Sequence, residues 1–301
     1  METSNIVAVG MSTFDELIIL HSYPLEDQKY MADNVVSSYG GMAANVAINL
    51  SHLNHNVALL SAVGDDYIGK DVFTHLSKER VNISGVRIIK GYTTKVYIII
   101  NSARISRTAI ANQGVTISSL DEQQRNLIQD AKLVYLDGSV KSEIVTEILR
   151  EVDKTESKIF FNLETYTNTQ LDLFQQCDYG VMDEGVASSL SSGYSFRALL
   201  KKLWRKENSL KGITCGKKGS LFYNGEEYFA SKSYKVDEVD TTGAGDAFQS
   251  GIVLGIIKGW DIEFTLKVAS VIAGLSCTAI GAHTYRFDLE HILGIVRNLD
   301  Y

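Results

Sequence analysis

The chain has 301 residues, of which 45% are hydrophobic and 22% are charged, and its formal net charge is −7. This length suits one large α/β domain or two small ones, and the acidic balance argues against a nucleic-acid-binding protein, which normally carries a basic face. The sequence contains no apolar run of about 18 residues that could span a membrane, and no secretory signal. Three scattered cysteines predict no disulfide framework, so we expect a cytoplasmic protein.

Hydrophobic periodicity predicts strands and helices in alternation along most of the chain. In chain order, strands are expected at residues 5–10, 28–38 (a pair), 57–63, 95–100, 108–112, 132–136, 158–163, 178–182 and 212–215, and a hairpin at a sheet edge within 219–238. Helices are expected at residues 42–53, 68–80, 141–151, 184–206, 244–258, 262–280 and 288–298. Strands that alternate with helices build βαβ units, so the predicted fold class is α/β with a mainly parallel, doubly wound sheet flanked by helices.

No linker-like stretch or internal repeat divides the chain, so we expect a single domain over residues 1–301. Two early segments, near residues 17–38 and 95–112, are interpreted as insertions. Their β-branched and alternating residues predict a small β-sheet that is added to the main one.

The segment Asp240–Phe248 has the composition of an anion-binding turn. It follows an alternating stretch, Tyr234–Val239, that predicts a strand, and it opens the predicted helix 244–258. Gly243 and Gly245 remove side-chain bulk from the turn. Backbone N–H groups can therefore converge on one point, with the positive end of the helix dipole behind them.

Asp246 stands at the end of this turn. Its carboxylate is placed to accept the proton of an attacking hydroxyl, while the N–H groups neutralise charge that develops on phosphoryl oxygens. The alternative is a structural glycine turn in which Asp246 caps the helix, and a bare Gly-x-Gly-Asp pattern favours that alternative. The choice depends on the longer string around the pattern.

The whole string Asp240–Phe248 resembles the C-terminal signature of the ribokinase-like (PfkB) carbohydrate kinase family. The N-terminal signature is recognised in Gly40–Ala47, followed by Ser61–Gly69, and the resemblance extends over essentially the whole chain. It implies a ribokinase-like fold and a transferase that moves the γ-phosphoryl group of ATP to a hydroxyl of a small sugar. It also implies that the two insertions form a lid over the sugar, and that two lids pair in a homodimer.

Carried over position by position, the resemblance implies roles for three groups of residues. The expected catalytic base and anion hole are Asp246 with Gly243, Ala244 and Gly245. The positions that match sugar-contacting ones are Asp15, Gly41 and Asn45. The positions that match the strand and turn at the nucleotide are Thr214, Gly216 and Gly219.

The implied cofactors are ATP, Mg²⁺ and potassium. Asp240 and Thr242 fall where many family members bind a monovalent cation. Many members also carry an Asn-x-x-Glu motif that organises Mg²⁺ through water, but here Asp183 stands in the place of the asparagine and Val186 in that of the glutamate. Asp183 and its neighbour Glu184 are the metal candidates, because Mg²⁺ keeps several waters and takes few carboxylates.

Within the family, the chain most resembles the ketohexokinase and sulfofructose kinase branch, through Pro24–Asn34 and the missing glutamate. In sulfofructose kinases, a lysine and an asparagine at the positions of Lys29 and Asn112 help to hold the sulfonate, and Ser139 here replaces an added arginine. The implied acceptor is a ketohexose or a derivative of one. Candidates to replace the missing cation are two arginines of the second insertion, Arg104 and Arg107.

Rival functions stay open at this point. A nucleoside kinase on the same fold would need stacking surfaces for a base, and Tyr30, Tyr39 and Tyr97 leave room for one. A non-catalytic sugar sensor is disfavoured by Asp246, because a sensor has no use for a base. A NAD-dependent enzyme and a P-loop NTPase are disfavoured because neither glycine motif is complete in the sequence.

Overall fold

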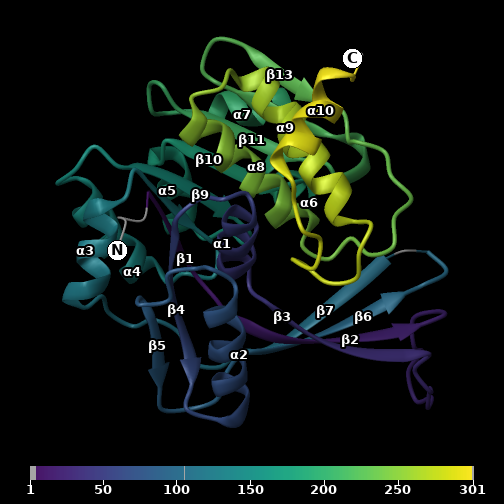
Figure 1. Cartoon of the computed structure of the whole chain (residues 1–301). Coiled ribbons are helices and arrows are strands. Elements are labelled where there is room, and N and C mark those ends of the chain that lie inside the picture. Colours follow the sequence, from purple (N-terminus) through teal and green to yellow (C-terminus); the bar gives the residue numbers. More distant parts are fainter. Residues whose placement is uncertain (1–4, 105, 300–301) are drawn as a thin grey trace.

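The computed structural model of the chain describes residues 5–104 and 106–299, so the ends of the expected domain at residues 1 and 301 lie outside it. The main sheet has nine strands in the order β13-β12-β11-β10-β9-β8-β1-β4-β5 (Figure 1). Their bounds are β1 (Ile6–Val9), β4 (Val57–Gly64), β5 (Val86–Ile89), β8 (Leu133–Leu136), β9 (Lys158–Leu163), β10 (Tyr179–Asp183), β11 (Leu210–Thr214), β12 (Ser220–Tyr223) and β13 (Tyr228–Ser231).

Strands β11 to β5 of the main sheet run parallel to their neighbours. The chain fills the sheet from β1 in two directions, first through β4 and β5 and later from β8 to β11. The edge β11–β12–β13 is antiparallel, which confirms the predicted hairpin. The predicted α/β class with a mainly parallel, doubly wound sheet is confirmed. In such sheets ligands bind at the carboxyl ends of the strands where the direction of filling reverses, here between β1 and β8.

Helices cover both faces of the main sheet (Figure 1). One face carries α1 (Met42–His52), α2 (Tyr67–Lys78), α8 (Ala244–Lys258), α9 (Ile262–Ser276) and α10 (Leu289–Arg297). The other carries α3 (Glu122–Asp130), α4 (Ser142–Val152), α5 (Asn168–Gln176), α6 (Glu184–Ser191) and α7 (Phe196–Leu203). The central strand β1 contributes to both cores, because Ile6 and Ala8 point to one face and Val7 and Val9 to the other.

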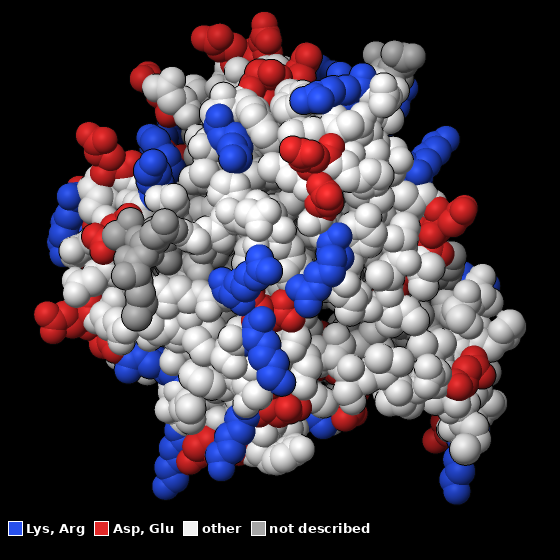
Figure 2. Space-filling model, viewed as in Figure 1, with Lys and Arg blue, Asp and Glu red and all other residues white. Residues whose placement is uncertain are grey.

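The surface of this fold carries charges of both signs. Figure 2 shows Lys and Arg side chains interspersed with Asp and Glu on the face in view, without one continuous basic surface. None of the helices in the described residues is long and apolar enough to cross a bilayer.

A small sheet projects from the side of the main body, and it consists of four strands in the order β3-β2-β6-β7 (Figure 1). Their bounds are β2 (Thr13–Leu20), β3 (Asn34–Gly40), β6 (Lys95–Asn101) and β7 (Ser106–Asn112). Strands β6 and β7 lie within residues 95–112, whereas β2 begins before the expected segment 17–38.

Strand register decides which side chains of the small sheet share a face. Asp15 pairs with Val96. Four residues further along the strands, Ile19 pairs with Ile100, which in turn pairs with Arg107. Because every second residue points to the same side, Asp15 and Arg107 lie on one face. The buried apolar side chains on this face are Leu17, Ile98 and Ile100. The opposite face exposes Val35 and Ile110, each by 55%.

Several predicted elements differ from the structure. Strand β2 and the helices α3 and α5 were not expected, and residues 28–33 form no strand in the described chain. The predicted strand Tyr234–Val239 is wrong. This segment runs along α9 instead of joining the sheet, since the N–H of Tyr234 donates to Oγ of Ser270 at 2.9 Å. Its alternating residues therefore reflect one side that faces a helix and one that faces solvent.

Candidate active site

The N-terminus of α8 is open to a ligand. Gly243 caps this helix with φ 75°, and a Cβ there would lie 2.6 Å from Cα of Ala282, so only glycine fits. At Gly245, by contrast, a Cβ would meet no atom within 4 Å. None of the described side chains caps the helix, although the N–H of Ala244 donates to the carbonyl oxygen of Thr241 at 3.2 Å. The N–H groups of the first turn point toward the positive end of the helix dipole, where an anion is stabilised. The predicted anion hole of Gly243, Ala244 and Gly245 needs this arrangement.

Asp246 is the third residue of α8 and is 9% exposed. Nδ2 of Asn45, in α1, donates a hydrogen bond to its Oδ2 at 2.7 Å. Burial raises the pKa of Asp246 to about 7, although the Asn45 hydrogen bond and the charge of Arg107 lower it. A carboxylate with a pKa near neutral pH has the strength that a general base needs.

Asp15, in β2, is 6% exposed, and its Oδ1 accepts a hydrogen bond from Oγ1 of Thr13 at 2.6 Å. Burial raises the pKa of Asp15 to about 6, against the Thr13 hydrogen bond and the charge of Arg107. Arg107 thus acts electrostatically on both Asp15 and Asp246. The fold therefore brings these two carboxylates and one guanidinium to the same region.

Gly41 precedes α1 as its cap residue, with φ 98°. A Cβ at Gly41 would lie 2.2 Å from the carbonyl oxygen of Met11, so the turn excludes any side chain. This turn positions Asn45 one helical turn later, where its amide meets Asp246.

The two residues expected to hold a polar sugar tail lie apart from this group. Lys29 is exposed in the connection between β2 and β3. Asn112 pairs with Lys95, which pairs with Phe14, so it lies on the face of the small sheet opposite to Asp15. Arg107, from the same strand as Asn112, shares the face of Asp15.

The residues expected at the nucleotide lie at the end of β11 and in the turn that joins it to β12. Thr214 ends β11, opposite Asp183 at the end of β10. Gly216 and Gly219 have left-handed φ values of 53° and 95°. A Cβ on Gly219 would lie 1.9 Å from the carbonyl oxygen of Ser231, so the turn itself requires glycine there.

The residues expected to bind cations already contact protein groups. Asp240 accepts hydrogen bonds from N and Oγ1 of Thr242 at 2.9 and 2.7 Å, and from N of Gly281 at 2.9 Å. Glu184 accepts one from Nζ of Lys218 at 2.7 Å. Across residues 5–104 and 106–299, no three His, Cys, Asp or Glu side chains are close enough to hold a metal ion directly. A Mg²⁺ ion here would be held through its water molecules.

Two further acids lie at strand ends and were not expected from the sequence. Asp137, after β8, is fully buried and accepts hydrogen bonds from the N–H groups of Met11, Ala43 and Ser139. Glu164, after β9, is exposed as a whole, yet desolvation of its carboxyl group, together with the charges of Asp137 and Asp183, raises its pKa to about 7. Both acids follow predicted strands directly, at the sheet edge where ligands bind in this fold class.

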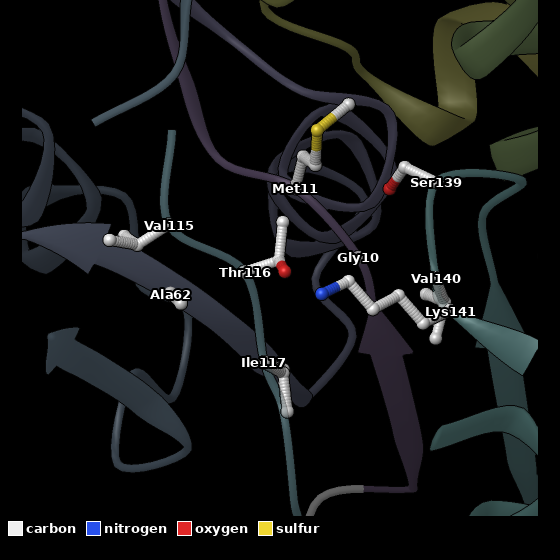
Figure 3. A pocket seen from close by; sticks show the side chains of 9 residues that line it. All are labelled: Gly10, Met11, Ala62, Val115, Thr116, Ile117, Ser139, Val140 and Lys141. Carbon is white, nitrogen blue, oxygen red and sulfur yellow. The ribbon is translucent and has the colours of Figure 1, made fainter. Parts of the chain in front are cut away.

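A small cavity lies beside Asp137 at the carboxyl ends of β1 and β8 (Figure 3). The residues that line it are Gly10, Met11, Ala62, Val115, Thr116, Ile117, Ser139, Val140 and Lys141. Its volume of about 20 Å³ fits about one water molecule and no sugar. In Figure 3 the amine of Lys141 extends toward Gly10 and Thr116. Asp15 and Asp246 are not among the residues that line it.

A family model described as pfkB family carbohydrate kinase matches residues 4–181 and 185–286. The chain belongs to this family. A pfkB family carbohydrate kinase is a phosphotransferase with a hydroxyl acceptor, so the predicted family and enzyme class are confirmed. The match spans the segments that hold Asp15, Asn45 and Asp246.

Relatives of this pfkB family kinase carry several substrate names. A Pyrococcus horikoshii protein whose name proposes a sugar kinase is 30% identical over 260 residues, which cover 81% of this chain and 82% of that protein. The ribokinase of Lactococcus lactis is 24% identical, and the match covers 99% and 98% of the two chains. Other relatives at 24% identity are named deoxyribokinase, from Salmonella typhi, and nucleoside kinase, from Methanothermobacter thermautotrophicus.

Solved ribokinase structures share the fold of this pfkB family kinase. The Arabidopsis thaliana ribokinase, complexed with ribose and ATP, has a TM-score of 0.83 at 20% identity, covering 98% of this chain and 99% of that one. The Giardia lamblia ribokinase has a TM-score of 0.85 at 18% identity, with the same coverage. The predicted ribokinase-like fold is confirmed.

Proposed function

We propose that this kinase transfers the γ-phosphoryl group of ATP to a hydroxyl of a small sugar, with Asp246 as the general base. The observation that carries the proposal is the buried Asp246 carboxylate at the open N-terminus of α8, with a pKa raised to about 7. Asp246 takes the proton of the attacking hydroxyl. The N–H groups of Gly243, Ala244 and Gly245 meet the charge that develops on the transferred group.

Asp15, Gly41 and Asn45 bind and orient the sugar in this proposal. Asp15 faces the same region as Asp246, as the shared influence of Arg107 indicates. A carboxylate accepts hydrogen bonds from two sugar hydroxyls, which fixes the reacting one against the base. The small sheet acts as the lid of a single kinase domain and excludes water, which would otherwise compete as acceptor.

ATP meets the turn of Thr214, Gly216 and Gly219 in this proposal. A ribokinase-like structure from Escherichia coli is named as a complex with ATP and Mg²⁺, at 20% identity to this chain. Mg²⁺ supplies charge neutralisation for phosphoryl transfer when it is bound. Potassium is proposed near Asp240 and Thr242, where it would share Asp240 with the groups that already donate to it.

Glu164 and Asp183 are the best-placed residues for the water shell of Mg²⁺. Desolvation raises the pKa of Glu164, and the charges of Asp137 and Asp183 raise it further, so a divalent cation nearby would favour the ionised carboxylate. Glu184, the neighbour expected from the sequence, is instead paired with Lys218. Asp183 accepts a hydrogen bond from N of Val186 through Oδ1 at 2.7 Å as the cap of α6, so its Oδ2 is the oxygen proposed to face the water shell.

Replacing Glu164 with glutamine is expected to raise the Mg²⁺ concentration for half-maximal activity several-fold, because one carboxylate is lost from the water shell. The matched control is Glu184→Gln, which should change that concentration much less. Mn²⁺ binding in the presence of ATP, followed by electron paramagnetic resonance, gives a readout that does not depend on turnover. Equal metal dependence in both variants would contradict the assignment of Glu164.

The proposed acceptor is a ketohexose or a ketohexose derivative with a polar or anionic tail, as expected for the ketohexokinase and sulfofructose kinase branch. Arg107 supports this, because its guanidinium shares the face of Asp15 and acts on both site carboxylates. Lys29 and Asn112 are not needed for this contact. Arginine also binds sulfonate and phosphate groups in a fork that lysine cannot reproduce.

Removing the guanidinium with Arg107→Ala is expected to raise KM for an anionic ketohexose by roughly ten- to a hundredfold, the range for charge-assisted hydrogen bonds. KM for uncharged fructose should change far less. Arg104→Ala is the matched control, since Arg104 lies in the same hairpin before β7. Steady-state kinetics with both sugars measure the effect, and an unchanged KM for the anionic sugar in Arg107→Ala would refute this contact.

A nucleoside kinase is the second candidate, and relatives with that name favour it. A nucleoside needs an aromatic surface at the acceptor site. Tyr39 stacks on His75 at 4.0 Å, and both Tyr39 and Tyr97 belong to the face of the small sheet opposite to Asp15. Tyr30 donates its hydroxyl hydrogen to Gln28 in an exposed loop. Because the three tyrosines lie away from Asp15, a sugar is favoured over a nucleoside as the phosphoryl acceptor.

A homodimer through the small sheet is also proposed. Val35 and Ile110 expose apolar surface on the face opposite to Asp15, and a second copy would cover them. The mass in solution, measured by light scattering, tests this, and a monomer at micromolar concentration would refute it.

A panel of acceptors tests the proposed function as a whole. ADP release is measured with fructose, its 1- and 6-phosphates, 6-deoxy-6-sulfofructose, ribose and a nucleoside. We expect the highest kcat/KM with one of the ketohexoses. A preference for the nucleoside would support the second candidate, and no turnover despite sugar binding would support a non-catalytic sensor.

A further inference from the structure

A buried chain of side chains leads away from Asp246 through two histidines. Asn45 donates from Nδ2 to Asp246 at 2.7 Å, and its Oδ1 lies 3.1 Å from Nδ1 of His283. Nε2 of His283 lies 3.0 Å from Nε2 of His75. Asp246, Asn45 and His283 are 9%, 5% and 6% exposed. The four residues come from α8, α1, the connection before α10, and α2, so only the folded chain brings them together.

Hydrogen positions along this chain follow from one constraint. An ionised Asp246 only accepts, so Asn45 must turn its Nδ2 toward Asp246 and its Oδ1 toward His283. His283 must then carry its hydrogen on Nδ1. Burial lowers the pKa of His283 to about 3, and a proton on His75 would lower it further, so the His283 ring is neutral and its Nε2 accepts from His75.

The surroundings keep both rings uncharged and fixed. The charged or titratable groups that act on them are Glu79, His52 and Arg286, with Lys78 and Asp71 at His75. Arg286 pairs with Glu79 at 2.8 Å, which neutralises the nearest acid. On its other side, His75 stacks on Tyr39 of the small sheet, with ring planes 9° apart.

We infer that His283 and His75 are positioning residues for the base, holding the amide of Asn45 in the one orientation that donates to Asp246. This inference rests on the proposed role of Asp246. Without the Nδ1–H of His283, the amide of Asn45 is free to flip, and its oxygen would then face the carboxylate. The pKa of Asp246 would rise, and less of the base would be ionised at neutral pH. Tyr39 gives the small sheet a direct contact with this chain.

The test compares variants that differ in one hydrogen-bonding group. His283→Phe removes both nitrogens, and His283→Gln keeps an amide N–H for Asn45. His75→Phe keeps the ring that stacks on Tyr39 but removes the donor to His283. The control is His291→Phe, on the exposed side of α10. Melting temperatures establish that each variant is folded, and His283→Gln and His75→Phe carry the test if His283→Phe is not.

The readout is the pH dependence of kcat/KM, together with the pKa of Asp246 from carbon-13 NMR of labelled aspartate. The Asp246 resonance is identified by its loss in Asp246→Asn. We expect His283→Phe to raise both the pKa of Asp246 and the midpoint of the pH profile by about one unit, which lowers kcat/KM roughly fivefold at pH 7 and roughly tenfold well below it. His75→Phe should give a smaller shift, and His283→Gln and His291→Phe almost none.

The two readouts separate failure of this inference from failure of the proposed function. An Asp246 pKa that is the same in folded His283→Phe and in the wild type would overturn the inference, whatever the turnover. An NMR shift without any sugar-dependent turnover would support the hydrogen-bonded chain while refuting the proposed kinase reaction.

Discussion

Replacing Asp246 with asparagine is expected to lower kcat by about 10² to 10⁴ while ATP and sugar bind nearly as well as before. The introduced amide has the shape of the carboxylate and still accepts a hydrogen bond from Asn45, but it cannot take a proton. Rapid-quench or steady-state ADP assays at saturating substrates measure kcat, and calorimetry measures binding. A near-normal kcat in this variant would refute Asp246 as the base.

The role of Asp246 as the base also predicts how kcat/KM depends on pH. Because burial raises the pKa of Asp246 to about 7, wild-type kcat/KM should rise with pH and level off above that value. The residual activity of Asp246→Asn should lack this rise. Asp15→Asn is the matched control, since it should raise KM for the sugar and retain the rise near pH 7.

Loss of activity in Asp246→Asn should not come from loss of folding. The pKa of Asp246 is higher in the folded chain than its ordinary value of 3.8, so ionisation of this group destabilises the fold as pH rises from about 4 through 7. The neutral amide carries no such cost. The variant should therefore melt at the same or a higher temperature than the wild type at pH 8, which differential scanning calorimetry measures.

The second large effect separates two glycines that are only two residues apart. Gly245→Ala is expected to lower kcat by about 10² or more, because its methyl group would occupy the open space where the phosphoryl group approaches the N–H groups. The same alanine should leave stability unchanged or raise it by about 0.5 kcal/mol, since alanine favours helix.

Gly243→Ala is the matched comparison and should behave in the opposite way. Its φ of 75° and the 2.6 Å approach to Ala282 make alanine incompatible with the turn, so the melting temperature should fall. Denaturant unfolding and ADP assays on both variants test the pair. A stable and fully active Gly245→Ala enzyme would contradict the anion hole.

Most of the main sheet could be predicted because buried parallel strands are nearly continuous apolar runs, as β4 (Val57–Gly64) shows with every residue buried. Strand β2 was missed because Leu17–Leu20 breaks its alternation. Helices α3 and α5 have few apolar residues, and capping boxes at Asp121 and Thr167 were the overlooked indication.

Some residues of the candidate site could be predicted from the sequence, and others could not. Asp246 and the glycines before it lie in one short string, so a motif found them. Asp137 and Glu164 could have been found as acids that directly follow predicted strands. His283 could not, since its contact with Asn45 joins residues 238 positions apart and depends on how α1 packs on the C-terminal helices. Alternation along a strand puts Arg107 and Asn112 on opposite faces, but only the strand register shows that Arg107 is the one that shares the face of Asp15.

The most direct test of the central claim is a measurement of both products, ADP and phosphorylated sugar, from wild type and Asp246→Asn with ATP, Mg²⁺ and the best ketohexose of the panel. The account predicts one phosphorylated sugar for each ADP in the wild type, detected by mass spectrometry, and at least about a hundredfold less of both in the variant. ADP without phosphorylated sugar, or equal amounts of the sugar phosphate from the two proteins, would contradict it.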